Sequence, residues 1–296
     1  MYASLPQSAK VEVSNLLAGE LLNAAERLPR YDNRDFYATE LQESVYSALH
    51  SENPSALASL VEEIKECLGR PPYCALVQGL LFDEGNKVFV ALNRAFGELV
   101  ARPYEAPRAQ LVHYIQPATD IRSTRGGHES ERLHTDTADW KPPVELISMV
   151  CIRADPAGGG RSRVLDVDSI RDEVEKQLGP AVLQRLETEN VPWQLASYCG
   201  GGVEWRTVLT AESVCWRRYT IDLALEETGT TLTPEMLGAL EDFEEVVAHT
   251  PRTIEFLMRS GDLLFSDNRR TIHARTPIDN GTESDRLMIR SWIRRE

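Results

Sequence analysis

A histidine and an aspartate stand two positions apart in the middle of the chain, at His134 and Asp136 in the segment LHTDT (133–137). We expect this segment to be a strand, and residues two apart on a strand point to the same face. One imidazole and one carboxylate could therefore bind a single metal ion from one rigid element. Such a pair also occurs by chance as ordinary structure, so a third ligand is needed to make the prediction specific.

The third candidate ligand is His273, far downstream in the segment SDNRRTIHARTPI (266–278). Two histidines and one carboxylate form the facial triad typical of non-haem iron(II) sites, which leaves positions open for substrates and oxygen. We therefore predict that His134, Asp136 and His273 bind iron. The other histidines are predicted to be surface or core residues without a ligand role: His50, His113, His128 and His249.

Two arginines four positions apart, Arg286 and Arg290, lie in the apolar C-terminal segment DRLMIRSWIR (285–294). If the segment is a strand, they share one face with Met288 and Trp292, and the other face carries Leu287, Ile289 and Ile293. Arginine is almost never fully buried without a partner, and its planar fork fits a carboxylate. The pattern predicts a buried anion site; the alternative is an edge strand with solvated arginines.

The elements that would position these residues are mostly short strands separated by glycine- and proline-rich turns. After the first hundred residues, strands are expected at 110–116, 133–137, 144–153, 161–167, 203–209, 214–222, 261–267 and 285–294. Helices are expected at 168–178, with Asp168 as the N-cap, and at 234–248. The polar segment 117–131 and the glycine-rich segment 196–203 are candidate lids.

The first part of the chain is more helical. Helices are predicted at 53–68 and 87–100, with a buried strand at 74–82 between them. The predicted fold class is mainly β with flanking helices and a double-stranded β-helix (jelly-roll) core. We expect residues 1–296 to form a single domain, in which a front section (1–109) packs on a core of about 110–296.

The formal net charge of −14 argues against a nucleic-acid or anionic-membrane partner, because both require basic surfaces. The five cysteines form no CxxC pair, so neither a disulfide framework nor a zinc knuckle is indicated. The sequence has no secretory leader pattern and no apolar stretch of the roughly 18 residues that a membrane span needs. We expect a cytoplasmic protein with a small-molecule substrate and make no prediction of its oligomeric state.

From about Gln110 to Arg294 the sequence resembles the taurine dioxygenase (TauD/TfdA) and clavaminate synthase-like family of iron(II)/2-oxoglutarate oxygenases. The resemblance rests on the HxD pair, the distal histidine and the arginine that follows it. It implies that Arg286 binds 2-oxoglutarate, assisted by Ser162, where the family more often has threonine. It also implies that Arg290 meets an anionic group of the substrate; the alternative is a structural salt bridge from Arg290 to an acidic residue such as Asp136 or Asp267.

The implied chemistry is oxidation of a small molecule by O2, with 2-oxoglutarate converted to succinate and CO2. Hydroxylation of an unactivated C–H bond in an amino-acid-like or natural-product substrate is the expected outcome. Asp139 and Trp140 follow the metal motif closely and are candidate substrate residues, although turn packing explains them equally well. The presence of Asp136 argues against halogenation, because halogenating relatives lack the carboxylate ligand.

Other outcomes stay open on the sequence alone. The same cofactors could support desaturation, ring closure or epimerisation. The same three ligands could serve a zinc or manganese hydrolase, although no general base for such an enzyme is visible. A catalytically silent jelly-roll protein that binds a metal or ligand is the alternative outside enzymes.

Overall fold

The largest sheet has seven strands and joins segments from both ends of the chain. The computed structural model describes residues 2–101, 111–116, 129–278 and 285–295. The strand order is β1–β2–β10–β5–β12–β3, with β4 also paired to β12, and only β1 and β2 are parallel. The strands are β1 (Lys10–Glu12), β2 (Cys74–Gln78), β3 (Glu98–Val100), β4 (His113–Ile115), β5 (Leu146–Arg153), β10 (Leu263–Asp267) and β12 (Leu287–Arg294).

A second, three-stranded sheet packs on one face of the first. Its order is β11–β6–β9, formed by Thr271–Arg275, Ser162–Asp166 and Ile254–Phe256. Both sheets contribute to one buried apolar cluster, in which Leu76, Leu264 and Met288 of the large sheet meet Val164 and Phe256 of the small one. Sheets that bury their inner faces in this way form a two-layer core.

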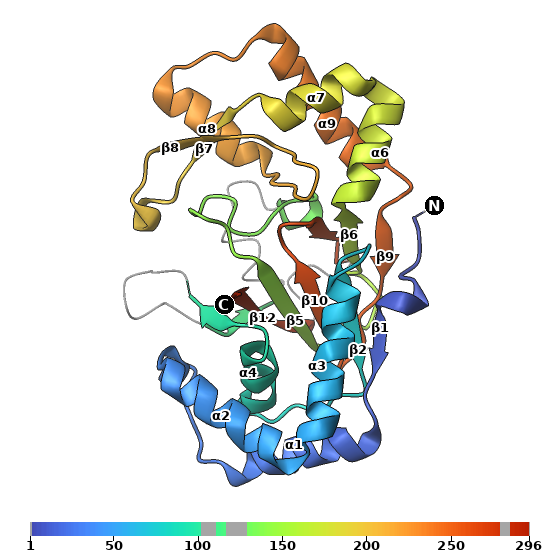
Figure 1. Cartoon of the computed structure of the whole chain (residues 1–296), viewed down its shortest axis with the longest axis vertical. Coiled ribbons are helices and arrows are strands. Elements are labelled where there is room, and N and C mark those ends of the chain that lie inside the picture. Colours follow the sequence, from blue (N-terminus) through green and yellow to red (C-terminus); the bar gives the residue numbers. More distant parts are fainter. Residues whose placement is uncertain (1, 102–110, 117–128, 279–284, 296) are drawn as a thin grey trace.

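Helices from the first hundred residues cover the outer face of the large sheet (Figure 1). They are α1 (Asn15–Arg27), α2 (Thr39–Glu52), α3 (Pro54–Leu68) and α4 (Lys87–Arg94), with short 3-10 turns at Gln7–Ala9 and Asp35–Tyr37. Helix α3 confirms the helix predicted at 53–68. The Asn53 side chain accepts the Ala56 N–H at its start, and Leu57, Leu60 and Ile64 are buried at helical spacing.

A second helical group lies beyond the small sheet (Figure 1). It consists of α6 (Val167–Leu178), α7 (Pro180–Thr188), α8 (Arg218–Thr228) and α9 (Pro234–His249), with the hairpin of β7 (Val191–Gln194) and β8 (Val203–Arg206). Ile170 and Phe243 of this group share a buried cluster with Leu165 and Ile272 of the small sheet. The molecule is therefore layered as helices, large sheet, small sheet and helices, so that the helices cover the outer face of each sheet.

The helix predicted at 87–100 is wrong in its second half. Helix α4 ends at Arg94, and Glu98–Val100 forms strand β3, paired with Trp292–Arg294 of β12. The break occurs at Gly97, whose φ is +148° and whose missing Cβ would lie 2.1 Å from the Arg294 carbonyl oxygen. Only glycine allows this close approach of two backbones, so a distant strand ends the helix.

Two further predictions are corrected in the second half of the chain. The segment 214–222, predicted as a strand, has a single β-bridge at Val214 and then enters helix α8 at Arg218. Ile221 and Ala224 are buried there three residues apart, which suits a helix rather than a strand. The N-cap of α6 is Asp166, which accepts the Ser169 N–H, and not Asp168.

Most other predicted strands are found, some of them shorter. Five predicted strands are confirmed: 74–82 by β2, 144–153 by β5, 161–167 by β6, 261–267 by β10 and 285–294 by β12. The helix predicted at 234–248 is confirmed by α9. Strand β8 ends at Arg206 rather than at 209, and β4 occupies the described part of 110–116. The single-domain organisation stays a prediction, but strands β1, β2 and β3 of the front section belong to the large sheet.

The candidate lids are only partly visible. Most of 117–131 lies outside the described residues, and its end forms a 3-10 turn at Glu129–Glu131. The segment 196–203 forms the tip of the β7–β8 hairpin and contains a 3-10 turn at Ser197–Cys199. Among the described helices, none is long and apolar enough to cross a membrane.

Candidate metal centre and adjoining cavity

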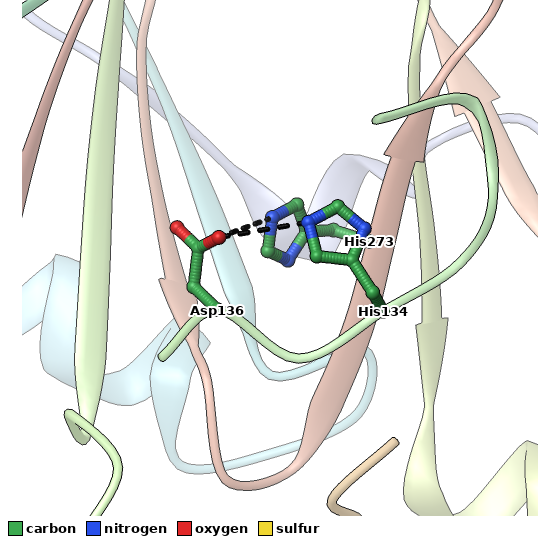
Figure 2. Close-up of side chains that lie close together, drawn as sticks. All are labelled: His134, Asp136 and His273. Atoms are coloured by element: carbon green, nitrogen blue, oxygen red, sulfur yellow. Dashed lines mark ion pairs between the residues drawn. The ribbon is translucent and has the colours of Figure 1, made fainter. Parts of the chain in front are cut away.

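His134, Asp136 and His273 converge on one point, as the sequence predicted. Asp136 Oδ1 lies 3.5 Å from Nε2 of His134 and 3.8 Å from Nε2 of His273. Figure 2 shows the carboxylate facing the two imidazole rings, whose centroids are 4.6 Å apart. Within the described residues, this is the one group of three or more such side chains arranged to hold a metal ion.

The backbone that positions the two upstream ligands is not the strand that we predicted at 133–137. His134 makes a single bridge to His273, with reciprocal backbone hydrogen bonds of 3.0 and 2.9 Å. The chain then turns at Asp136, because the Asn268 side chain accepts the Asp136 N–H and donates to the Asp136 carbonyl, each at 3.0 Å. Since these backbone groups bond to an amide side chain rather than to a neighbouring strand, no ladder forms.

The protonation states of the ligands suit a metal ion. Nδ1 of His134 lies 2.9 Å from the Arg132 carbonyl oxygen, and its Nε2 faces Asp136. Burial, followed by the nearby His134, lowers the pKa of His273 to about 3, so this ring is neutral at physiological pH. Neutral imidazoles and an ionised carboxylate are the forms that bind a metal.

The Asp136 carboxylate stays ionised despite its burial. Desolvation acts to raise its pKa, but the Arg290 guanidinium and a hydrogen bond from His134 lower the pKa well below its usual range. Nη1 of Arg290 lies 3.0 Å from Oδ2, and Nε1–H of Trp292 donates to the same oxygen at 2.8 Å. Arg290 Nη1 also donates to Oδ1 at 3.3 Å. The outer oxygen Oδ2 is therefore held by Trp292 and Arg290, and the inner oxygen Oδ1 faces the histidines and Arg290.

The spacing of the donor atoms fits a small metal ion. Three ligands with bonds of about 2.1 Å at right angles lie roughly 3 Å apart. The distances of 3.5 and 3.8 Å from Asp136 Oδ1 to the two Nε2 atoms are slightly longer, so a modest side-chain adjustment would complete the coordination. The residues present therefore fit the facial arrangement that leaves open positions.

A cavity between the two sheets connects these ligands to Arg286. Its described lining includes His134, His273, Ser162, Arg286 and Arg290. Ser162 begins β6 and Arg286 immediately precedes β12, so residues far apart in the sequence line one space. Arg286 is only 6% exposed, which excludes the alternative of a solvated arginine on an edge strand.

The turn before β6 positions Arg286. Nη2 of Arg286 donates to the Gly160 carbonyl at 3.3 Å, and the Gly160 N–H donates to the Pro277 carbonyl at 3.0 Å. Gly160 has a φ of +63°, and a Cβ there would lie 2.6 Å from Nε of Arg286. The buried Asp155 holds the turn by accepting the Gly159 N–H at 2.8 Å. The arginine therefore lies against bare backbone, where any side chain would displace it.

Asp139 and Trp140 lie beside the metal centre rather than in the described cavity lining. Trp140 is 4% exposed, and its Nε1–H donates to Tyr198 Oη at 3.1 Å. The Asp139 carbonyl accepts the Ala196 N–H at the tip of the β7–β8 hairpin. Both residues thus connect the metal motif to the candidate lid 196–203, and their roles toward a substrate stay predictions.

Sequence reasoning missed three residues that position the site: Asn268, Gly160 and, as a hydrogen-bond donor to Asp136, Trp292. Trp292 was expected on the same face as the arginines, which is correct, but its partner was not predicted. The glycine run 158–160 carried a turn signal without any indication that Arg286 lies over it. No local pattern identifies Asn268, since its partners lie more than a hundred positions upstream.

Fold and site together define a mononuclear metal protein whose ligands lie at the junction of two packed sheets. The sequence model of the family described as "Taurine catabolism dioxygenase TauD, TfdA family" matches residues 48–292. The chain therefore belongs to this dioxygenase family, which confirms the resemblance seen in the sequence. No curated protein sequence matches the chain.

Solved structures of similar fold include two oxygenases. Asparagine oxygenase in complex with Fe(II), 3-hydroxyasparagine and succinate has a TM-score of 0.74 at 18% identity, covering 96% of this chain and 93% of that chain. The non-heme iron oxygenase OrfP in complex with Fe and alpha-ketoglutaric acid has a TM-score of 0.72 at 16% identity, covering 99% and 95%. OrfP with Fe, succinate and (3S)-hydroxy-L-Arg has a TM-score of 0.68 at 16% identity, covering 96% and 93%. At such identities the likeness concerns the fold.

Proposed function

We propose that the protein is an iron(II)- and 2-oxoglutarate-dependent oxygenase that hydroxylates an unactivated C–H bond of an amino-acid-like small molecule. The observation that carries this proposal is the shared cavity: His134 and His273, which converge with Asp136, line the same space as a buried arginine. A metal site alone fits several enzyme classes. A metal site beside a buried guanidinium fits a co-substrate with two carboxylates, of which one binds the metal and the other binds the guanidinium.

The fold supports the proposal at the level of architecture. We infer that the two face-to-face sheets are the halves of a jelly-roll core, with the helices of the front section packed on its larger sheet. A jelly roll closes its two sheets around a central space, which is where the cavity and the three ligands lie. Family membership and the fold of the oxygenase structures agree with this arrangement.

The proposed roles follow from position. His134, Asp136 and His273 hold iron(II), which, when bound together with 2-oxoglutarate and O2, supplies the oxidising chemistry and releases succinate and CO2. Arg286 binds the distal carboxylate of 2-oxoglutarate through its planar fork, and Ser162 donates its hydroxyl to the same group. The apolar cluster between the sheets keeps water from this region and strengthens both interactions.

The arginines around the cavity are the groups to which a substrate carboxylate could bind. The described lining contains neither aspartate nor glutamate, although the whole chain is acidic. It contains four arginines: Arg163, Arg275, Arg286 and Arg290. Three of these arginines are already paired with protein carboxylates: Arg163 with Glu255, Arg275 with Glu131 and Arg290 with Asp136. With 2-oxoglutarate on Arg286, a substrate carboxylate would therefore share Arg290 with Asp136. Arg290, Asp139 and Trp140 are the proposed substrate-facing residues.

A cytoplasmic location stays a prediction.

Anaerobic addition of iron(II) and then 2-oxoglutarate to the purified protein tests the co-substrate. We expect a weak visible charge-transfer band that requires both components. A zinc or manganese hydrolase, or a silent binding protein, gives no such band. The absence of the band, in protein that binds iron(II) by titration, would contradict the proposal.

A screen of the common amino acids for stimulated succinate release tests the substrate class. Mass spectrometry of the products then separates the possible outcomes: hydroxylation adds one oxygen, desaturation and ring closure remove two hydrogens, and epimerisation leaves the mass unchanged. The expected result is a gain of one oxygen on an amino acid or a close derivative. Succinate release that only compounds lacking a carboxylate stimulate would contradict the proposed substrate class.

A further inference from the structure

The outer oxygen of the metal carboxylate has two protein partners on one strand. Trp292 donates its indole N–H to Asp136 Oδ2 at 2.8 Å. Nη1 of Arg290 lies 3.0 Å from the same oxygen and also donates to Oδ1 at 3.3 Å. Both partners belong to β12, two residues apart, so both side chains emerge on the same face of the strand. The guanidinium carbon of Arg290 lies 4.7 Å from the centre of the Trp292 ring, within cation–π range.

The indole itself has little freedom to move. Trp292 is fully buried, and its backbone is paired on both sides, with Ile147 of β5 and Val100 of β3. Its ring packs at 4.5 Å from His113 and, edge to face, at 5.5 Å from Trp140. A donor that sits on a central strand and is packed on two sides defines a fixed point for its acceptor.

We propose that Trp292 is a positioning residue for the metal ligand Asp136, an inference that rests on the iron site of the proposed function. Its N–H holds the outer oxygen, so the carboxylate presents Oδ1 to the metal in one orientation and binds through one oxygen. Partners of metal-ligating side chains orient those ligands and commonly affect metal affinity as strongly as 10- to 100-fold. The positive charge of Arg290 lies beside the same carboxylate, and the face of the Trp292 ring packs against the guanidinium.

Trp193 shows what a purely structural tryptophan looks like in the same chain. It is also fully buried, and its Nε1–H also donates, at 3.2 Å, but to the backbone carbonyl of Arg206 in the β7–β8 hairpin. Its ring also carries an arginine, with the Arg206 guanidinium carbon 4.6 Å from its centre. The two tryptophans match in burial, donor and cation partner, and differ in whether the acceptor is a metal ligand.

The test compares Trp292→Phe with the matched control Trp193→Phe. Both changes keep an aromatic ring and remove a buried N–H. We expect Trp292→Phe to weaken iron(II) binding about 10- to 100-fold in anaerobic titrations and to shift the charge-transfer band formed with 2-oxoglutarate. Trp193→Phe should lower thermal stability without changing either quantity. At saturating iron, the Michaelis constant for 2-oxoglutarate should stay unchanged in both variants, because Arg286 is not affected.

Wild-type iron affinity and an unshifted band in folded Trp292→Phe would overturn the inference. Failure of the proposed function is a different result: the unmodified protein would then bind no iron or give no band. Equal losses of iron affinity in Trp292→Phe and Trp193→Phe would also overturn the inference that Trp292 positions Asp136, since a general loss of packing would explain both losses.

A measurement on the unmodified protein covers the case in which Trp292→Phe does not fold. The indole N–H signals of the five tryptophans can be followed by NMR after ¹⁵N labelling, with Trp292 assigned by replacing the other four one at a time. Zinc(II), which is diamagnetic, serves as the probe. We expect zinc binding to shift the Trp292 signal and to leave the Trp193 signal in place. An unshifted Trp292 signal at saturating zinc would refute the positioning role.

Discussion

The two ends of the cavity are built in opposite ways. At the metal end, the ligand Asp136 is held by other side chains: Asn268, Arg290 and Trp292. At the arginine end, formed by Arg286 and Ser162, the positioning comes from backbone, because Arg286 lies on Gly160 and donates to its carbonyl. The metal end is fixed by polar side chains that contact Asp136, and the arginine end is fixed by the absence of a side chain at Gly160.

The difference follows from what each end must accept. A metal ion requires a few ligand atoms at fixed spacing, so the ligand side chains need hydrogen-bond partners on the atoms that do not face the metal. A carboxylate of 2-oxoglutarate requires a flat guanidinium with room on one side, and bare backbone provides that room. Substitutions at the metal end should therefore change metal affinity, and substitutions at the arginine end should change co-substrate affinity.

The largest expected effect is loss of a ligand. His273→Ala should abolish iron-dependent turnover and reduce iron(II) affinity more than a hundredfold, because two ligands cannot replace the facial triad. Anaerobic iron titration and succinate production measure the two effects. His249→Ala, at an exposed position on α9, is the control and should behave as the unmodified protein. Wild-type iron affinity in folded His273→Ala would remove His273 from the site.

A smaller effect is expected from Arg286→Lys. The change keeps the charge but loses the fork, and a hydrogen bond to a charged group contributes about 1.5–3 kcal/mol, so the Michaelis constant for 2-oxoglutarate should rise roughly 10- to 100-fold. Iron affinity should not change. Arg171→Lys, which affects an arginine paired with Glu187 on the helices, is the control. A rise in the iron dissociation constant instead would show that the two ends are not separate.

Gly160→Ala should act on the same end more weakly. The new Cβ would lie 2.6 Å from Nε of Arg286, so the guanidinium must shift and the Michaelis constant for 2-oxoglutarate should rise several-fold. Gly158→Ala is a matched control: its φ of +79° brings similar backbone strain, about 1–2 kcal/mol, but nothing lies within 4 Å of its Cβ. Both variants should melt at lower temperature. Equal Michaelis constants for the two variants would contradict the close approach.

The last expected effect is on stability rather than on activity: a pH dependence that arises at the metal end. The pKa of His273 is about 3 in the folded protein and about 6.5 when unfolded, so the unfolded chain binds more protons between these values. Stability of the metal-free protein should therefore fall as the pH drops below about 6.5, by up to about 1.4 kcal/mol per pH unit. The depressed pKa of Asp136 acts in the same direction at lower pH.

Urea unfolding at several pH values measures this dependence. His273→Gln removes the titrating group and should flatten the curve between about pH 6.5 and 4 relative to the unmodified protein. Arg286→Lys should leave the shape of the curve unchanged. Parallel curves for the unmodified protein and His273→Gln would show that this histidine does not carry the effect.

The predictions from sequence were most successful where chemistry depends on residue type. Two histidines, an aspartate and a buried arginine have few alternative uses in combination, and their order along the chain identified the family. The predictions failed where the conformation depended on a distant partner. The segment 133–137 has the composition of a strand, but Asn268 takes the backbone groups of Asp136, and the ladder is lost. The helix at 87–94 ends because β12 passes against Gly97.

By itself, the sequence determined the candidate ligand set, the position of the buried arginine and the apolar pattern of most strands, since these are properties of residue types and local periodicity. The tertiary structure alone decided how the ligands are held. Trp292 meets Asp136, Gly160 meets Arg286, and Asn268 meets the backbone of the metal motif, each across more than a hundred residues. Such contacts cannot be read locally, because a hydrogen-bond donor or a missing Cβ has no function until folding brings its partner beside it.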